Sequence, residues 1–400
     1  MTKIEPYLPA SVFGIGSGAN NNVPRVFISP NRYIQGDGII QNLGTYLGLL
    51  PSKRAGLLIS SGGLRRFGET ITDSLTKSQI DTVLSVFNGE CSLEEVERVV
   101  REFQSEDEPI DCLVAVGGGK CVDAGKSIAY RLGIPSVVCP SLASNDAPCS
   151  ALSVLYNAEG VAQGAEFFPY SPSIVAVDTR MVADAPARYL VSGMGDAMAT
   201  YYEATTCFHN EKARSAVGAR PTLAAREIGT LCASTLFEFG VAASRAVEES
   251  RIDESLERVT EANTLLSGLG FESGGLAAAH SVAQAFTVVP KVQQTYLHGE
   301  MVAMGVLTQL TLEGNSQEAK KVSNFFASVG LPVALSQLSL SVDDTSQLDA
   351  IATTAVAAPI MNNEPFDVSP QSVIEAITLA DKIGSDTINV HGQGPYENLH

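Results

Sequence analysis

Two histidines in segments rich in glycine and alanine are the residues best suited to chemistry in this chain. His280 ends the run Leu269-Gly-Phe-Glu-Ser-Gly-Gly-Leu-Ala-Ala-Ala-His, and His298 follows Tyr296-Leu297. A histidine on an apolar helix face is more often a satisfied core residue than a ligand. Two of them on separate helices could nevertheless face one pocket. With a carboxylate they would give a divalent metal three protein ligands and leave a fourth position open.

The carboxylate that could complete this site is Asp196. It ends the segment Ser192-Gly-Met-Gly-Asp196 and precedes an alanine-containing helical pattern. The glycines predict a turn, so the aspartate would begin a helix, and an aspartate in that position is most often only an N-cap. The two histidines favour the other interpretation, in which all three residues bind one metal ion.

A glycine run, Gly117-Gly118-Gly119-Lys120, is the second chemical feature. It follows the apolar run Cys112 to Val116 and precedes residues at helical spacing, which predicts a strand, a tight turn and the start of a helix. The free N–H groups of such a helix start attract an anion, the glycines let a phosphate approach the backbone, and Lys120 adds a positive charge. The run matches neither G-x-G-x-x-G nor the Walker motif, so by itself it could simply turn the chain.

Strand and helix patterns alternate along the first half of the chain. Hydrophobic periodicity predicts strands at residues 23–28, 55–60, 80–87, 111–116, 134–139 and 173–178, and a turn at residues 157–160 between two further strand-like runs. It predicts helices at residues 38–50, 67–76 and 92–104, the last with a capping box. This order predicts a mainly parallel sheet covered on both faces and resembles half of a Rossmann fold. The polar loop from Pro140 to Tyr156 follows a strand, where open sheets of this class bind ligands.

The second half of the chain has a different pattern. After Pro186, long segments rich in alanine, leucine and glutamate with few strand signals predict a helical bundle. We therefore expect a lead-in at residues 1–22, a Rossmann-like dinucleotide-binding domain at residues 23–185 and a helical metal-binding domain at residues 186–400. Helices are expected at residues 318–329, 347–357 and 370–383. The tail after Ile388 is expected to be irregular, with His391 and His400 exposed.

Composition and charge exclude several functions. The 400 residues, 45% of them hydrophobic, can bury large cores. The formal net charge of −18 argues against nucleic acids and anionic membranes as partners. No apolar run is long enough to span a bilayer, and the N-terminus does not resemble a signal peptide, so we expect a cytoplasmic protein. Seven cysteines without C-x-x-C pairs suit reduced, buried thiols in that compartment.

Four motifs together resemble the zinc-dependent glycerol dehydrogenases of the iron-containing alcohol dehydrogenase superfamily. They are the glycine run extended to Lys126, the loop Ala143-Ser-Asn-Asp-Ala-Pro-Cys-Ser-Ala-Leu-Ser-Val-Leu-Tyr156, the pair Gly195-Asp196, and the segment from Asn263 to His280. The resemblance covers residues 27–312 and, more loosely, continues to residue 383. It implies an N-terminal nucleotide-binding α/β domain, an all-α C-terminal domain and an active site in the cleft between them.

The resemblance also implies roles for individual residues. Asp196, His280 and His298 would bind Zn²⁺. Asp146 would accept a hydrogen bond from a substrate hydroxyl, which suits a polyol. NAD would contact a larger set, namely Ser61, Gly118, Gly119, Lys120, Asp123, Ser141, Ser144, Ser150, Leu152 and Tyr156.

Four positions depart from the pattern of that family. Ser61 stands where the family usually has an aspartate for the ribose, and with Arg65 nearby NADP becomes possible. Asn145 replaces a threonine and Ala283 replaces a histidine, so the substrate pocket could differ. Thr200 stands where iron-binding relatives have another histidine, which leaves three protein ligands and favours zinc.

The resemblance therefore implies a reversible hydride transfer between NAD(P) and the secondary hydroxyl of glycerol or a related vicinal diol, with zinc polarising the hydroxyl. One alternative is a relative that acts on a different alcohol. Another is a lyase similar to 3-dehydroquinate synthase, which would need a basic cluster that residues 262–300 do not supply. A non-catalytic nucleotide-binding or scaffold protein would be expected to lack the three metal ligands. Like the family, the chain is expected to form a closed homo-oligomer.

Overall fold

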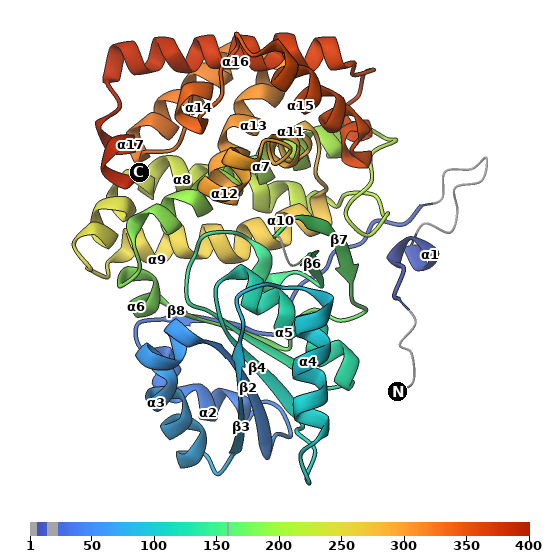
Figure 1. Ribbon diagram of the computed structural model, residues 1–400, viewed down its shortest axis with the longest axis vertical. Helices are drawn as coiled ribbons and strands as arrows, with labels where there is room; N and C mark the ends of the chain where they lie inside the picture. Colours follow the sequence, from blue (N-terminus) through green and yellow to red (C-terminus); the bar gives the residue numbers. More distant parts are fainter. Residues whose placement is uncertain (1–5, 14–22, 158–159) are drawn as a thin grey trace. The chain divides into compact units, whose positions relative to one another are not determined.

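In the computed structural model, residues 6–13, 23–157 and 160–400 are described. They form two compact units, one made mainly of residues 28–185 and the other mainly of residues 186–400 (Figure 1). The tripeptide Ser144–Asp146 belongs by its contacts to the second unit, which a division into consecutive segments does not capture. Of the predicted lead-in, residues 1–5 and 14–22 lie outside the described residues, and α1 (Pro9–Phe13) is a short helix.

A six-stranded parallel sheet forms the centre of the first unit. Its order is β1-β8-β5-β4-β2-β3. The strands are β1 (Tyr33–Gly36), β2 (Arg54–Ser60), β3 (Asp81–Phe87), β4 (Cys112–Gly117), β5 (Ser136–Pro140) and β8 (Ile174–Asp178). Every neighbouring pair is parallel, as the alternation of strands and helices predicts. β4 and β8 are buried along their whole length, which is why they are almost uninterrupted apolar runs.

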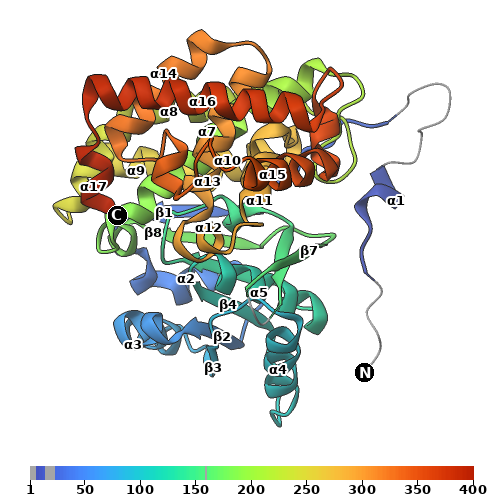
Figure 2. The ribbon, with the colours of Figure 1, turned by 45° about the horizontal axis from the view of Figure 1, so that its top comes forward.

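Helices cover both faces of this sheet. They are α2 (Leu43–Leu47), α3 (Ser61–Lys77), α4 (Leu93–Gln104), α5 (Gly119–Leu132) and α6 (Thr179–Ala183). Leu57 of β2 packs with Ile71 of α3 in one core, and Leu58 packs with Val99 of α4 in another. Because successive residues of a strand point to opposite faces, these two cores lie on opposite sides of the sheet. Figures 1 and 2 show α3 on one side of the sheet and α4 on the other.

The ends of β4 and β5 bring the two predicted ligand-binding segments together. Gly117, the last residue of β4, is in register with Pro140, the last residue of β5. The N–H of Ser141 donates to the Gly117 carbonyl at 2.8 Å. The glycine run and the polar loop therefore start side by side, at the sheet edge where this class of fold binds ligands. After the loop and a 3₁₀ turn, η2 (Ala147–Cys149), β6 (Leu152–Tyr156) and β7 (Ala162–Phe167) form an antiparallel hairpin.

The strand predicted at residues 23–28 is wrong. Arg25 makes an isolated β-bridge with Arg220, and Pro24 beside it has no N–H to donate. The first strand of the sheet is β1, whose four partly buried residues are too few to show an alternating pattern. The helix predicted at residues 38–50 is divided into a 3₁₀ turn, η1 (Ile39–Asn42), and α2.

The second unit is helical, as predicted. Residues 186–400, all of which are described, contain no strand. The helices are α7 (Ala187–His209), α8 (Leu223–Glu248), α9 (Glu254–Glu261), α10 (Ser267–Gly274), α11 (Ala278–Phe286), α12 (Pro290–Thr295), α13 (His298–Leu312), α14 (Ser316–Val329), α15 (Thr345–Ala357), α16 (Pro370–His391) and α17 (Gly394–Leu399). Shorter turns are the π-helical η3 (Ala262–Leu266) and the 3₁₀ turns η4 (Leu335–Leu338) and η5 (Pro359–Asn363). Within the described chain, no helix has both the length and the apolar character needed to cross a bilayer.

The irregular tail predicted after Ile388 is also wrong. α16 continues to His391, and α17 follows after a short break. Gly392, with φ of 74°, ends α16, and Pro395 stands in the first turn of α17, so these residues mark helix boundaries rather than a loop. His391 and His400 are both exposed as residues, as expected, but the side chain of His400 is only 11% exposed.

Candidate functional site

Three helices bring Asp196, His280 and His298 to one place. Asp196 lies inside α7, His280 lies in the first turn of α11, and His298 is the first residue of α13. One possible ligand atom from each residue lies within 4.8 Å of the others. The Nε2 atoms of both histidines are 3.3 Å from Oδ1 of Asp196. The structure thus groups the three residues that the sequence points to as metal ligands.

Asp196 is not the helix cap that its glycine-rich segment predicts, because the glycines before it lie inside α7. A Cβ atom on Gly195 would lie 2.3 Å from the carbonyl oxygen of Gly299, and one on Gly299 would lie 1.8 Å from the carbonyl oxygen of Ser192. The two glycines therefore let the backbones of α7 and α13 touch. Each glycine stands next to a candidate ligand, Asp196 or His298.

A similar contact brings α11 close to α13. A Cβ atom on Gly305 of α13 would lie 2.1 Å from the carbonyl oxygen of Ala279, the residue before His280. Small residues around the two histidines thus have a packing function. They allow three helices to approach so closely that three short side chains meet.

The electrostatics of these residues suit a cation. Asp196 is fully buried, and although burial favours its neutral form, His298 and His280 lower its pKa below the usual range. Its Oδ1 atom has no hydrogen bond of good geometry to any described residue. A buried, ionised oxygen in that condition is costly unless a cation binds it. Two imidazole nitrogens and one carboxylate oxygen form a donor set that zinc and similar metals prefer, so the residues present fit a bound metal ion.

Glu203 is a residue that sequence reasoning missed. It lies two helical turns after Asp196 on α7 and is fully buried. Its Oε2 is 2.5 Å from Nδ1 of His280, and its Oε1 accepts the N–H groups of His280 and Ala277 at 2.9 and 2.8 Å. A carboxylate at Nδ1 holds the proton there, which leaves Nε2 free as a ligand atom. The sequence signal was a second acid on the same face of an otherwise uncharged helical stretch.

Asp146 lies beside the three candidate ligands. Its N–H donates to Oδ2 of Asp196 at 3.2 Å, and its own Oδ2 accepts the Ser267 hydroxyl at 2.8 Å. The Ser267 hydroxyl also lies 2.8 Å from that of Thr200. Burial and the charge of Asp196 raise the pKa of Asp146 well above its usual value. Ser267 was not predicted in this role; it follows the π-helical turn η3, a feature common at functional sites.

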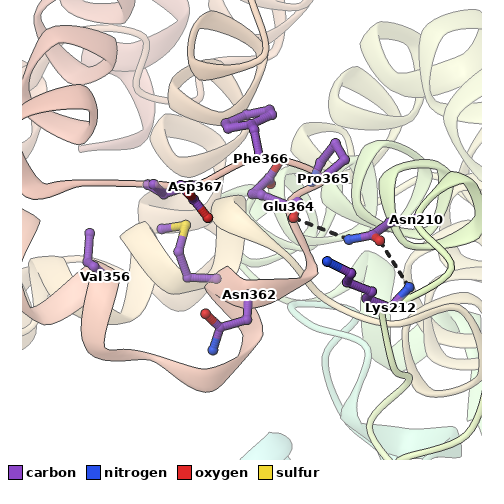
Figure 3. A pocket seen from close by; sticks show the side chains of 10 residues that line it. Asn210, Lys212, Val356, Asn362, Glu364, Pro365, Phe366 and Asp367 are labelled. Atoms are coloured by element: carbon purple, nitrogen blue, oxygen red, sulfur yellow. Dashed lines mark hydrogen bonds between the residues drawn. The ribbon is translucent and has the colours of Figure 1, made fainter. Parts of the chain in front are cut away.

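A pocket of about 460 Å³ lies in the second unit and includes none of the three candidate ligands (Figure 3). Its lining includes Lys212 and Glu364, and Asn210 donates to the carbonyl oxygen of Glu364 at 3.2 Å. Oε1 of Glu364 accepts the N–H of Ala278 at 3.1 Å. Burial and the neighbouring carboxylate of Glu313 raise the pKa of Glu364 to about 8, so it is protonated at neutral pH. Glu364 thus supports the start of α11.

The glycine run forms the turn and helix start that its sequence predicts. Gly118 is the N-cap of α5, and Gly119 and Lys120 are its first residues. A glycine has no side chain to cap the first N–H groups, which remain suited to an anion. The Lys120 ammonium lies 2.7 Å from Oε2 of Glu90 and 4.7 Å from the centre of the Tyr156 ring. Four of the predicted cofactor residues, Gly118, Gly119, Lys120 and Tyr156, are therefore neighbours.

Two other predicted cofactor residues are occupied by internal contacts. Asp123 is buried, with Oδ1 2.8 Å from the Lys126 ammonium and Oδ2 accepting the N–H of Val154 at 3.0 Å. The same ammonium donates to the hydroxyl of Ser150 at 3.2 Å. These bonds tie α5 to the β6 region and give Asp123 and Ser150 a structural role.

The remaining predicted cofactor residues have mixed surroundings. Ser61 is the exposed first residue of α3, and Leu152 begins β6. Ser141 is buried directly after β5. The carbonyl oxygen of Ser144, in the second unit, accepts the hydroxyl of Ser192 at 3.4 Å. The structure does not gather these four residues into one described cluster.

Comparison with known proteins relates these features to a family. The family described as iron-containing alcohol dehydrogenase matches residues 30–179. The chain is 41% identical over 359 residues to the glycerol dehydrogenase of Thermotoga maritima, covering 89% of this chain and 97% of that relative. It is 39% identical over 362 residues to the glycolaldehyde reductase of Halobacterium salinarum, covering 90% of this chain and 98% of that relative.

The solved structure of glycerol dehydrogenase from Schizosaccharomyces pombe is similar in fold. Its TM-score with this chain is 0.86 at 32% identity, covering 92% of this chain and 93% of that one. The similarity therefore includes both the parallel sheet and the helical unit. The chain belongs to the iron-containing alcohol dehydrogenase family, beside the glycerol dehydrogenases to which it is similar along nearly its whole length.

Proposed function

We propose that this protein is a metal-dependent polyol dehydrogenase. It would oxidise the secondary hydroxyl of glycerol or a related vicinal diol reversibly, to dihydroxyacetone or a hydroxyketone, with NAD or NADP as the hydride acceptor. The observation that carries the proposal is the meeting of Asp196, His280 and His298, with Asp146 hydrogen-bonded to the same group. The relatives named glycerol dehydrogenase support the choice of substrate class.

The residues Asp196, His280 and His298 would hold a divalent ion, for which we propose zinc. Such an ion polarises a substrate hydroxyl and lowers its pKa. Three protein ligands are typical of catalytic zinc sites. Thr200 stands at the position where iron-binding relatives have another histidine, and its hydroxyl lies beside that of Ser267. The group therefore keeps three protein ligands, which supports zinc over iron.

The side chains around this group would orient the substrate. Glu203 keeps the proton of His280 on Nδ1, and the hydroxyl of Ser267 orients the carboxyl group of Asp146 by donating a hydrogen bond to it. Asp146 would then hydrogen-bond the second hydroxyl of the substrate. A vicinal diol has that hydroxyl and a simple alcohol lacks it, so Asp146 would select polyols.

The dinucleotide would bind at the glycine run. The N–H groups at the start of α5, together with Lys120, suit a pyrophosphate. When bound, the nicotinamide ring takes up the hydride. Ser61 is exposed and uncharged, so it would not repel a 2′-phosphate, and we propose that NADP is accepted as well as NAD.

An assay with a small substrate panel tests this function. The protein, with its metal content measured, receives NAD or NADP with glycerol, 1,2-propanediol or ethanol, and reduced nicotinamide is followed by absorbance. We expect oxidation of the diols, a much slower reaction with ethanol, and loss of activity on chelation that added zinc restores. Failure to oxidise any diol would contradict the polyol assignment, and full activity of the metal-free protein would contradict the metal assignment.

A second candidate is reduction of a hydroxyaldehyde at the same site. The relative named glycolaldehyde reductase favours it, so glycolaldehyde with reduced cofactor belongs in the panel. The lyase alternative is not favoured. Residues 262–300, which carry both histidines, contain a single basic side chain, Lys291, and this cannot form the cluster that a phosphorylated substrate needs.

We also propose a cytoplasmic location and a closed homo-oligomer. The seven cysteines are all free and buried, which suits a reducing compartment. Light scattering after gel filtration tests the assembly. We expect a mass that is a multiple of 42.1 kDa, and a single-chain mass would contradict the oligomer.

A further inference from the structure

His298 is supported less directly than the other two candidate ligands. Its side chain is 49% exposed, against 1% for Asp196 and 11% for His280. His280 has Glu203 behind its ring, but among the described residues Asp196 is the one carboxylate within ion-pair distance of His298. The position of His298 therefore depends on the start of α13, of which it is the first residue.

Glu300, two residues after His298, holds this helix start. Its side chain is 1% exposed, and its Oε2 accepts the N–H of Leu297 at 2.8 Å. This is the bond that the third residue of a helix makes to the residue before the helix in a capping box. The carboxylate thus fixes the backbone on both sides of His298.

Arg188, near the start of α7, donates two hydrogen bonds to this carboxylate. Its Nε lies 2.6 Å from Oε1 of Glu300, and its Nη2 lies 2.8 Å from Oε2. Nη2 also donates to the carbonyl oxygen of Thr295 at 3.0 Å. Paired bonds between a guanidinium and a carboxylate are among the strongest in proteins. Because α7 also carries Asp196, Arg188 links the helices of two candidate ligands.

His400 makes a third contact with Glu300. Its Nε2 lies 2.9 Å from Oε1 of Glu300, and its Nδ1 lies 2.9 Å from the carbonyl oxygen of Tyr396. Its ring stacks on that of Tyr396, with centroids 4.0 Å apart and planes 15° apart. The hydroxyl of Tyr396 donates to the carbonyl oxygen of Gln337. α17 is thereby fastened to the carboxylate that holds the first turn of α13.

We propose that Glu300, held by Arg188 and His400, is a positioning residue for the metal centre. It fixes the first turn of α13, and with it the imidazole of His298, without touching metal or substrate. A ligand that is already in place loses less conformational freedom when the ion binds, so Glu300 raises metal affinity. The inference rests on the proposed metal-binding role of His298 and its two partners.

The test compares E300Q and H400A with a matched control, E95Q. Glu95 is the buried third residue of α4, after the cap Ser92, and Arg98 grips it with two hydrogen bonds of 2.7 Å. Glu95 thus matches Glu300 in its place at the third position of a helix and in its pairing with an arginine, but it lies in the first unit, whereas the candidate ligands lie in the second. Each protein is stripped of metal and titrated with zinc against a chromophoric chelator, and the unfolding temperature of the metal-free form is measured.

We expect E300Q to weaken zinc binding by about ten- to a hundredfold and H400A by about fivefold, because both loosen the support behind a ligand. E95Q should lower the unfolding temperature but keep the wild-type zinc affinity. Unchanged zinc affinity in E300Q, or an equal loss in E95Q, would overturn the positioning role. If E300Q does not fold, H400A decides, and wild-type affinity in H400A would overturn the proposal. A wild-type protein that binds no zinc would instead refute the proposed metal centre itself.

Discussion

Four buried or half-buried acids surround the two histidines, and each has a different function. Asp196 is ionised and faces both imidazoles, and Glu203 faces the far side of one of them. Burial and the charge of its neighbour Asp196 raise the pKa of Asp146, and Glu300 is paired with an arginine. Environment, not residue type, separates these roles, because burial and nearby charge decide which carboxyl group keeps its proton.

Replacing Glu203 with glutamine should weaken metal binding. The amide keeps the shape of the side chain but loses the negative charge that holds the proton on Nδ1 of His280. We expect the dissociation constant for zinc, measured by competition with a chelator, to rise about ten- to a hundredfold. Zinc binding as tight as in the wild type would show that Glu203 supports only the fold.

Replacing Asp146 with alanine should change substrate choice. Ser267 and the backbone hold this carboxyl group beside Asp196, where it can meet a second substrate hydroxyl. We expect kcat/KM for glycerol to fall about ten- to a hundredfold, the usual cost of a hydrogen bond to such a group, and that for 2-propanol to change far less. An equal fall for both alcohols would argue against the selective role.

Replacing Glu364 with glutamine should change how stability depends on pH. The pKa of this acid is about 8 in the folded protein, above its usual value of 4.5. The folded state therefore binds more protons than the unfolded chain between these values, and wild-type stability falls as the pH rises through this range. Glutamine stays uncharged, so the gain in unfolding temperature of E364Q over the wild type should grow from pH 5 to pH 9. A difference that is the same at every pH would contradict the raised pKa.

The sequence was sufficient to predict which residues are the candidate ligands, but not where each lies in its helix or which residues support it. His280 and His298 stood out because they lie in small-residue segments, yet Asp196 was placed on a turn because its glycines also suit one. In the structure, Gly195 lies inside α7 and allows its close contact with α13. The partners of Glu203 and Glu300 could not be predicted, because they lie 77 and 112 positions away in the chain and no local pattern records such a contact.

At the scale of elements, close helix packing is what makes three ligands meet. Replacing Gly299 with alanine would place a Cβ atom 1.8 Å from the carbonyl oxygen of Ser192, so α13 must move away from α7. We expect loss of about 1–3 kcal/mol of stability and a large loss of metal affinity. Gly394 of α17 is a control, since a Cβ atom there meets nothing within 4 Å. If G299A bound metal as tightly as G394A, the packing argument would fail.

Regular elements were predictable where their signals are local. β2, β4 and β8 are apolar runs, because strands covered on both faces need them, and the prediction located all three within a residue or two. β1 was not predicted, because its four residues are all partly buried and show no alternation of buried and exposed positions. The end of α16 and all of α17 were missed because glycine and proline mark helix caps as well as loops.

At the scale of the whole molecule, the proposed chemistry is divided between a sheet unit, whose helix start would bind an anion, and a helical unit, whose three candidate ligands would bind a cation. Each unit would carry its own part of the proposed reaction, and the motifs for both are present in one chain. The similarity to the glycerol dehydrogenase of Thermotoga maritima extends over 89% of the chain and therefore includes the motifs of both units.

The thiols of the whole chain should be unreactive in the folded state. Burial raises the pKa of Cys112 to about 11 and that of Cys139 to about 12, and all seven cysteines are buried. A thiol reagent such as Ellman's should therefore react slowly with the native protein and with seven groups after unfolding. Rapid reaction of several thiols in the native protein would contradict the described cores.

Zinc binding by Asp196, His280 and His298 can be observed in an anomalous-difference map from crystals of the protein, with data collected on both sides of the zinc absorption edge. We expect one strong peak bound by a carboxylate oxygen of Asp196 and by the Nε2 atoms of His280 and His298, present only above that edge. A peak at other residues, or no peak from crystals of active protein, would contradict it.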